Sequence, residues 1–320
     1  MQLDWADYWE NLLKVHKLKG VVDELNLVSN DAAVENICHS IFDCYEEHAK
    51  KLEIIRISLL QEVERLPGVH LQTSRVKGLD SLLVKIIIKK HKRMMDESDP
   101  YSTLSEINYM NVLTDLVGIR LILSYRGAWK DIHSAILQRF PLKEESDYSE
   151  DALIPLTDKE DFIAEKPRAY YAPGDDISIY EGEFIEPLLK ENGYRSVHYT
   201  LCYSGVYVEI QTRTIYDEAW SDCDHSFVYK QEENESHSAL KRLSGILCMY
   251  TNTSNDLGDL MKEVYDHSPV IEKDGECYFA SETLISDVDC LIDKYESARK
   301  LLLQFREQLN SEGGGVVNEE

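Results

Sequence analysis

The stretch SVHYTLCYSGVYVEIQT, residues 196–212, decides the fold because apolar and polar side chains alternate on both sides of Ser204 and Gly205. Such alternation is typical of β-strands, and a two-residue connection that contains glycine is typical of a tight hairpin. In this register position 198 faces position 211 and position 200 faces position 209. One face is then apolar, and the other carries a polar and ionisable set made of Ser196, His198, Thr200, Tyr207, Glu209, Gln211 and Arg213.

A second alternating run, DLVGIRLILSY at residues 115–125, predicts another strand with Asp115 just before it. Apolar residues spaced by three and four predict helices elsewhere. Helices are expected over residues 31–66, 79–94, 128–139, 213–230 and 238–309. The acidic stretch at residues 143–184 has turn residues and no steady period, so we expect a long loop there, and residues 311–320 are expected to be a disordered tail.

The chain has 59 acidic and 34 basic side chains, which gives a formal net charge of −25. A field of this sign repels nucleic acid and anionic membranes over most of the surface. The bias is reversed in one segment, residues 75–93, which carries Arg75, Lys77, Lys85, Lys89, Lys90, Lys92 and Arg93. A polyanionic ligand is therefore expected near this basic segment.

Seven cysteines are scattered without a CxxC pair, which favours free thiols in a reducing compartment. The N-terminus lacks the basic and apolar regions of a signal peptide, and no run of about 18 apolar residues occurs. We therefore expect a cytoplasmic protein that neither enters the secretory route nor spans a membrane.

The common nucleotide and metal signatures are absent from the sequence, including GxxxxGK[ST], GxGxxG, the kinase loops and HExxH. What remains is a set of carboxylates, cations and one loop tyrosine on patterned segments. Phosphoryl transfer needs cations and carboxylate-bound Mg²⁺, and an aromatic ring can stack on a base. Taken singly, each residue has an ordinary interpretation: Asp115 as a cap or turn residue, Glu209 as a solvent-facing side chain, and His198 as a structural histidine.

Four motifs in a fixed order change this balance. R-V-K-x3-S-x3-K (residues 75–85) precedes D-L-V-G-I-R (115–120), K-E-N-G-Y-R-S-V-H (190–198) and V-E-I-Q-T-R-T (208–214). This order resembles the RelA/SpoT synthetase domain of the alarmone synthetases. The resemblance implies an α+β fold in which helices flank a mixed, nucleotidyltransferase-like β-sheet. It also implies four parts: a helical N-terminal extension (1–66), a pyrophosphokinase domain (67–230), a helical C-terminal extension (231–310) and the tail (311–320).

The resemblance further implies an ATP-dependent diphosphotransferase that moves the β,γ-diphosphate of ATP to the 3′-hydroxyl of a purine nucleotide. Asp115 and Glu209 match its two Mg²⁺ carboxylates, and Glu209 is also placed to help deprotonate the attacking hydroxyl. For ATP, Arg75 matches the residue stacked on adenine, Lys77, Ser81 and Lys85 match phosphate contacts, and Arg120 supports the donor phosphates. On the acceptor side the matching residues are Lys190, Tyr194, His198 and Gln211.

The acceptor itself stays open between several choices. GDP or GTP, giving (p)ppGpp, is the simplest, and the alternatives are the 3′ end of tRNA for a toxin, an adenine nucleotide, or an inactive nucleotide-sensing module. Glu183 and Glu186 stand where relatives carry cations, a charge that Lys166 and Arg168 would have to replace. The first 74 residues leave no room for a hydrolase domain, so a synthetase-only member is expected. The C-terminal helices either pack on the fold or bind a partner, such as an antitoxin or a second copy of the chain.

Overall fold

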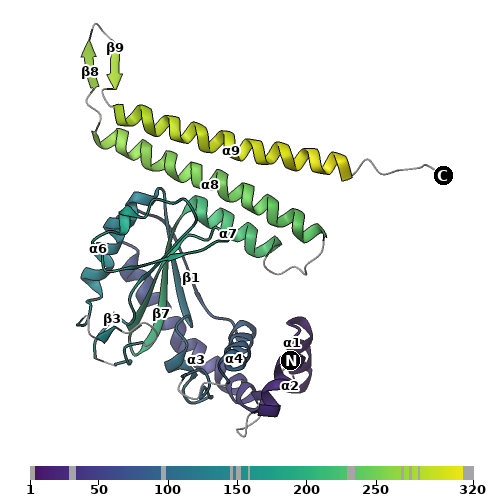
Figure 1. Cartoon of the computed structure of the whole chain (residues 1–320). Coiled ribbons are helices and arrows are strands. Elements are labelled where there is room, and N and C mark those ends of the chain that lie inside the picture. The colour runs from purple at the N-terminus through teal and green to yellow at the C-terminus, as the bar shows by residue number, and fades with distance from the viewer. Residues whose placement is uncertain are drawn as a thin grey trace, which may run out of the picture.

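The computed structural model describes residues 4–28, 34–94, 99–144, 147–148, 153–157, 159–228, 235–267, 270–273, 276–279 and 282–312. Its centre is a seven-stranded mixed sheet with strand order β1-β2-β7-β6-β4-β5, and β3 pairs with β6 off this path. Helices flank the sheet (Figure 1). The predicted α+β class is therefore confirmed.

The strands that build the candidate site are the first four in this order, with β1 at the edge of the sheet. β2 (Val117–Leu123) pairs in parallel with β7 (Val206–Thr214) and antiparallel with β1 (Val69–Val76). On its other side β7 pairs antiparallel with β6 (Ser196–Tyr203). The sheet is completed by β3 (Phe162–Ile163), β4 (Arg168–Tyr171) and β5 (Glu186–Leu189).

The hairpin of β6 and β7 has the predicted register, with His198 opposite Gln211 and Thr200 opposite Glu209. Its turn places Ser204 at φ 50° and Gly205 at φ 75°. Positive φ at both central residues is the twist that suits a two-residue hairpin. The alternation of this segment therefore fixed both the pairing and the composition of each face.

The apolar face of the hairpin packs on two helices, α3 (Val34–Val63) and α6 (Trp129–Arg139). Tyr199 is fully buried there, and its hydroxyl accepts a hydrogen bond from the indole of Trp129 (3.0 Å). The hydroxyl of Tyr203 donates to Glu62 on α3 (2.7 Å). Because these helices bury the apolar row, the polar row of the same strands is left to form a site.

The remaining helices lie around this core. α1 (Trp5–Val15) and α2 (Lys19–Val28) lie beside α4 (Leu79–Arg93), and α8 runs antiparallel to α9 above α7 (Figure 1). The bounds of the others are α5 (Tyr109–Val112), η1 (Arg126–Ala128), η3 (Ser178–Tyr180), α7 (Ile215–Phe227), α8 (Glu235–His267) and α9 (Glu282–Glu312). Within the described ranges, no helix has the length and apolar character needed to cross a membrane.

Two predictions about local structure were wrong, and one strand was not predicted. The segment before α4 that carries Arg75 is strand β1. The acidic stretch is not a loop throughout, because it holds β3, β4 and a 3₁₀ turn. The predicted helix over 238–309 is interrupted by a two-stranded hairpin, β8 (Val270–Lys273) and β9 (Glu276–Phe279), so the C-terminal extension is not wholly helical.

The expected disordered tail is only partly within the described residues. α9 continues to Glu312, so residues 311 and 312 are helical, and residues 313–320 lie outside the described residues.

The turn of the central hairpin gives a stability test. Gly205→Ala should lower the free energy of unfolding by about 1–2 kcal/mol, because a Cβ is costly in the left-handed region. Ser204→Asn should leave it unchanged or raise it slightly, because asparagine tolerates that region. Urea unfolding followed by circular dichroism measures both changes. Equal losses in the two variants would contradict the turn geometry.

Candidate active site on the polar face of the sheet

A cavity of about 160 Å³ opens on the polar face where three strands lie side by side. The parallel register sets Gly118 of β2 next to Glu209 of β7, and Arg75 of β1 lies opposite Gly118. Asp115 precedes β2 and reaches the same cavity. The full lining is Thr73, Ser74, Arg75, Asp115, Gly118, Ile119, Arg120, Glu209 and Gln211. Arginine and carboxylate side chains from distant parts of the sequence therefore line the same cavity.

Asp115 is paired with two lysines. Its Oδ2 lies 2.9 Å from Nζ of Lys77, and its Oδ1 lies 2.8 Å from Nζ of Lys85. Lys77 is buried, and its main chain is held on both sides: its N–H donates to Leu116 (2.8 Å) and its carbonyl accepts from Tyr45 (2.7 Å). Burial alone would raise the pKa of Asp115, but the charges and hydrogen bonds of Lys85 and Lys77 hold it below its ordinary value.

Glu209 also has two side-chain partners, His198 and Gln211. Its Oε1 lies 3.2 Å from Nδ1 of His198, and its Oε2 accepts from the amide of Gln211 (2.6 Å). Burial alone would raise the pKa of Glu209, but the contacts with His198 and Gln211 hold it below its ordinary value, with the charge of Asp115 acting in the opposite direction. Both carboxylates are therefore kept ionised and lie within electrostatic reach of each other.

A closed circuit of hydrogen bonds connects the acceptor-side residues to Glu209. Arg213 donates to the hydroxyl of Tyr194 (3.0 Å), which lies 3.0 Å from Nε2 of His198. Arg213 also donates to the side-chain oxygen of Gln211. With a proton on Nδ1 of His198, every contact has a donor and an acceptor, and two chains of hydrogen bonds run from Arg213 to Glu209. The circuit fixes the orientation of the carboxylate on the side away from Asp115.

The ring of Tyr194 lies near two other rings, those of Tyr170 and His198. Its ring centroid is 5.8 Å from that of Tyr170 and 6.0 Å from that of His198. The guanidinium of Arg213 lies 5.3 Å from the Tyr194 centroid, and Nζ of Lys190 lies 4.7 Å from the Tyr170 centroid. Aromatic faces and two cations thus gather at one end of the polar face.

Not every predicted residue joins the cavity. The predicted residues outside the lining are Lys77, Ser81, Lys85, Lys190, Tyr194 and His198. Lys77 and Lys85 contact Asp115, and His198 contacts Glu209, whereas Ser81 is exposed on α4 and Lys190 lies at the aromatic end. Arg120 lines the cavity but is paired through Nη1 with Glu218 of α7 (2.8 Å). Arg75 lines the cavity and is exposed.

The structure also brings in residues for which the sequence suggested no role. Arg213 was on the predicted polar row, but its contacts depend on helix α7, where Glu218 (3.2 Å) and Ser221 (2.9 Å) receive it. Tyr170 joins because β4 pairs with β6, which sets it opposite Ser196. No periodicity in the acidic stretch indicated that pairing.

Glu183 and Glu186 have their contacts outside the cavity. Glu186 lies 3.6 Å from Arg168, which also lies 3.4 Å from Glu165. Glu183 lies 3.9 Å from His133 of α6. Lys166 lies over the ring of Phe184, 5.3 Å from its centroid. The charge of Glu186 is therefore partly balanced by Arg168, and neither Glu183 nor Glu186 lines the cavity.

Asp115 and Glu209 are the carboxylates in the cavity that could hold a divalent cation. Oδ1 of Asp115 is buried with no hydrogen-bond partner other than its ion pair with Lys85. Among the described side chains there is no group of three or more His, Cys, Asp or Glu that could hold a metal ion unaided. Mg²⁺ commonly takes one or two carboxylates and completes its shell with substrate phosphates and water, so this pair fits such an ion.

Residues 74–234 match the family described as "Region found in RelA / SpoT proteins". Among solved structures the chain is similar to smu.1046c from Streptococcus mutans UA159, with 19% identity and a TM-score of 0.39 over 71% of this chain and 93% of that chain. A GTP pyrophosphokinase family protein from Streptococcus pneumoniae gives 18% identity, a TM-score of 0.38, and coverage of 72% and 92%. Small alarmone synthetase 1 from Bacillus subtilis, bound to its product pppGpp, has 22% identity and a TM-score of 0.37, and the match covers 69% of this chain and 90% of that chain. No curated protein matches the chain.

The lysine pair around Asp115 predicts a pH dependence of stability. The pKa of Asp115 is lower in the folded than in the unfolded chain, so its ion pairs contribute fully above the unfolded value of about 3.9 and are lost as the pH falls below it. The difference in unfolding free energy between wild type and Asp115→Asn should therefore shrink between about pH 6 and about pH 3. Urea unfolding across this range measures it. Asp23→Asn, at an exposed position on α2, is the control. A difference for Asp115→Asn that stays constant with pH would contradict the ion-pair reading.

Proposed function

Because the chain belongs to the RelA/SpoT family, we propose that it is an ATP-dependent pyrophosphokinase that transfers the β,γ-diphosphate of ATP to the 3′-hydroxyl of a purine nucleotide. GDP or GTP is the proposed acceptor, which makes (p)ppGpp the product. The observation that carries the proposal is the cavity on the polar face, where Arg75, Asp115 and Glu209 meet from three neighbouring strands within the family match. Such a reaction depends on positioning and charge balance more than on covalent chemistry.

On the donor side, Lys77 and Lys85 are the proposed ligands of the ATP phosphates. Both ammonium groups contact Asp115, which lines the cavity, at 2.9 Å for Lys77 and 2.8 Å for Lys85. A polyphosphate can replace Asp115 as the partner of these ammonium groups, because phosphate and carboxylate both accept strong, charge-assisted hydrogen bonds. Arg75, exposed on β1 beside Gly118, is proposed to stack on the adenine, and Arg120 to support the phosphates. Ser81 is proposed to contact the phosphates from the first turn of α4.

Asp115 and Glu209 would hold the Mg²⁺ ion, which when bound supplies positive charge to the nonbridging phosphate oxygens. The lowered pKa of both carboxylates keeps them in the ionised form that a cation requires. Glu209 is also proposed to orient the 3′-hydroxyl and help to remove its proton. His198, 3.2 Å from Glu209, fixes the direction of that carboxylate.

On the acceptor side, Tyr194 is proposed to stack on the purine base, with His198 and Gln211 lining the pocket. Lys190 and Arg213 supply positive charge at this end, where Lys190 lies over Tyr170 and Arg213 over Tyr194. A free nucleotide brings several 5′-phosphates that such cations can meet. The engagement of Glu186 by Arg168 removes part of the negative charge that would oppose them.

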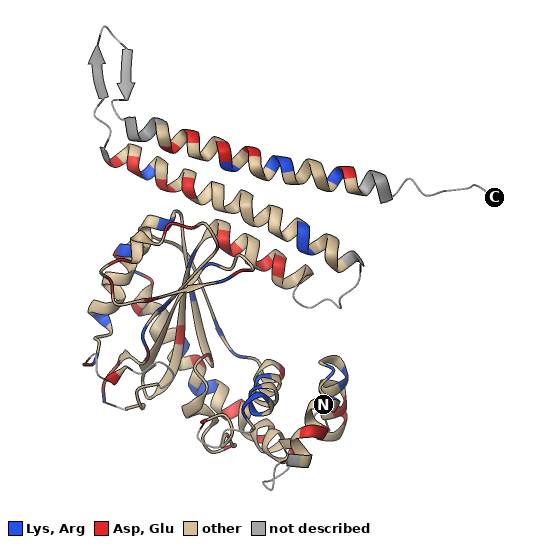
Figure 2. Cartoon of the chain, in the orientation of Figure 1, with Lys and Arg blue, Asp and Glu red and all other residues tan. Residues whose placement is uncertain are grey.

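The basic segment offers less to tRNA than its composition suggests, because α4 uses its cations internally. Lys90 donates to the carbonyls of Ser102 (2.7 Å) and Leu104 (2.9 Å). Lys89 lies over the ring of Tyr101, and Arg93 lies 3.4 Å from Asp99. Figure 2 shows basic residues on α4 and acidic residues along α7. This distribution favours a free nucleotide over a long RNA surface, which needs many unpaired cations.

We place the reaction in the cytoplasm, where nucleotide substrates and a reducing environment occur together. Six of the seven cysteines, Cys38, Cys44, Cys202, Cys223, Cys248 and Cys290, are free thiols, which suits that compartment.

The proposal is tested by incubating the protein with γ-labelled ATP, Mg²⁺ and, separately, GDP, GTP, AMP, ATP or deacylated tRNA. Label that comigrates with guanosine tetra- or pentaphosphate without RNA supports it. Label found only on tRNA, with a steep fall at higher salt and a further fall in Lys92→Glu/Arg93→Glu, would replace it with the toxin reading. A labelled 3′-diphosphate of AMP or ATP, resolved from the donor ATP, would indicate an adenosine alarmone, and no labelled product with any acceptor would favour the nucleotide-sensing module.

The carboxylates give the first mutational prediction. Asp115→Asn and Glu209→Gln should each lower kcat by about a thousandfold, since losing a metal carboxylate costs several kcal/mol. Circular dichroism at neutral pH should show that both variants remain folded. Asp23→Asn, at an exposed carboxylate on α2, is the control and should keep its rate. Turnover close to that of wild type in either cavity variant would remove the assignment.

Tyr194 gives the second mutational prediction. Tyr194→Ala should raise the acceptor KM roughly 5- to 150-fold, because stacking on a base is worth about 1–3 kcal/mol, and should change the ATP KM little. Tyr194→Phe keeps the ring but loses its bonds to His198 and Arg213, so it should retain most of the acceptor affinity. Steady-state kinetics with each substrate varied in turn separates the two effects. A rise in the ATP KM alone would place Tyr194 on the donor side.

A further inference from the structure

We propose that Arg195 is a positioning residue that holds the acceptor segment, residues 190–195, against helix α8 and thereby sets the place of Tyr194. The inference rests on the proposed function, because it gives Tyr194 a role in binding the acceptor. It assigns to α8 a part in the acceptor site, although α8 contributes no residue to the catalytic cavity.

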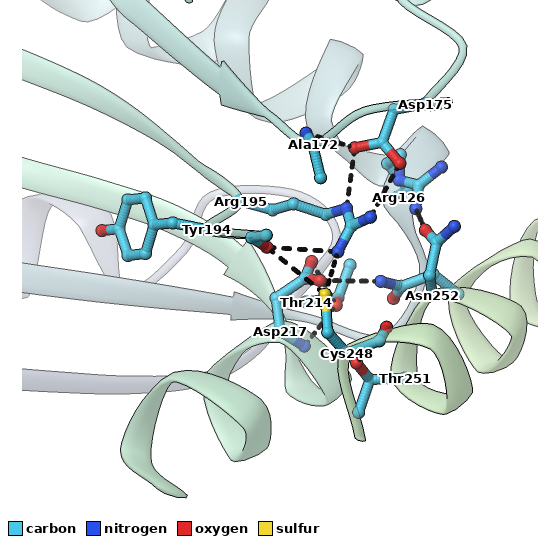
Figure 3. Close-up of polar contacts among 12 residues, drawn as sticks. Arg126, Ala172, Asp175, Tyr194, Arg195, Thr214, Asp217, Cys248, Thr251 and Asn252 are labelled. Atoms are coloured by element: carbon cyan, nitrogen blue, oxygen red, sulfur yellow. Dashed lines mark hydrogen bonds and ion pairs between the residues drawn. The ribbon is translucent and has the colours of Figure 1, made fainter. Parts of the chain in front are cut away.

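The guanidinium of Arg195 joins three segments of the chain (Figure 3). It binds Asp175, in the loop after β4, through Nε (2.7 Å) and Nη2 (2.9 Å). Its Nη1 donates to the carbonyl of Gly193 (3.2 Å) and to Sγ of Cys248 on α8 (3.3 Å). Asp175 in turn accepts from the main-chain N–H of Ala172 (2.8 Å). One buried side chain therefore connects two loops and a helix.

Arg195 and Tyr194 are neighbours in sequence whose side chains have different partners. Tyr194 contacts His198 and Arg213 in the circuit that ends at Glu209. Arg195 instead contacts the junction with α8, and Figure 3 shows the two side chains directed away from each other. Both residues directly precede β6, so bonds that hold the chain at Arg195 also restrict where Tyr194 lies.

The close approach of α8 depends on a glycine in the same segment. Gly193 has φ +90°, and a Cβ there would lie 2.5 Å from Sγ of Cys248. Beside this contact lies a cavity of about 360 Å³, whose lining includes residues 191–193 on one side and Cys248 and Met249 of α8 on the other. Side-chain packing therefore supports the acceptor segment only in part. The bonds of Arg195 must provide the rest, and a bidentate guanidinium is suited to this because its geometry is fixed.

A second arginine provides a matched control. Arg126 of η1 donates to Asn252 (2.7 Å) and contacts Asp256 (3.2 Å), both on α8. It therefore fastens the same helix to the body of the protein without a bond to the acceptor segment. If α8 acted only by stabilising the fold, losing either arginine would have the same effect.

The experiment compares Arg195→Met, Arg195→Lys and Arg126→Met in the full chain. Arg195→Met should raise the acceptor KM by about tenfold while the ATP KM and kcat stay within about twofold. This pattern is expected when a variant weakens binding of the acceptor equally in the ground state and in the transition state. Arg195→Lys should fall between wild type and Arg195→Met, because lysine keeps the charge but not the fork. Arg126→Met should leave the acceptor KM unchanged. Hydrogen exchange measured by mass spectrometry should become faster over residues 190–197 in Arg195→Met and not in Arg126→Met.

If Arg195→Met does not fold, Asp175→Asn carries the test, because it keeps the volume of the side chain and removes its charge; it should raise the acceptor KM selectively. Equal changes in the Arg195 and Arg126 variants, or an unchanged acceptor KM in folded Arg195→Met or Asp175→Asn, would overturn the inference and leave the proposed function standing. If the wild type transfers label to no acceptor, the proposed function fails. The exchange data then decide whether Arg195 orders the segment: faster exchange confined to the Arg195 variant supports that role, and its absence overturns it.

Discussion

The parallel pairing of β2 with β7 is the constraint on which the rest of the site depends. It sets Gly118 beside Glu209, so the residue that precedes one strand and a residue within the other reach the same cavity. The neighbouring strands then extend the arrangement, with β1 adding Arg75 on one side and β6 adding His198 on the other. If β7 paired one residue out of register, Glu209 would turn toward the apolar face and the two carboxylates would separate.

The parts of the fold that were predictable are those in which local alternation coincides with burial. The hairpin of β6 and β7 has a strongly apolar face, so both its strands and its register could be read from the sequence. β1 lies at an edge with only partly buried side chains, and β3, β4 and β5 have two to four residues each, too few to show a period. The pairing of β4 with β6 joins segments that are distant in the sequence, and a local sequence pattern does not predict such contacts.

The candidate site was predictable to a similar degree. Motif order and alternation gathered Asp115, Glu209 and His198, whereas the partners of these residues depend on how helices approach the sheet. The contact of Lys85 with Asp115 requires the placement of α4, and the contacts of Arg213 require α7. Arg195 was visible in a motif, but its function depends on α8, which lies beyond the family match. Contacts between elements that are distant in sequence account for most of what was missed.

The double pairing of Asp115 has a consequence for hydration. Lys77 has lost nearly all of its water on folding, since its side chain is only 9% exposed and its main chain is bonded on both sides. An ammonium in bulk water must shed its shell before it can contact an anion closely, and that cost lowers affinity. Here the dehydration belongs to the folding of the chain and not to the arrival of a ligand. When the proposed polyphosphate donor binds, Lys77 and Lys85 would exchange Asp115 for phosphate oxygens as their anionic partner. Lys77 would then not have to be dehydrated a second time.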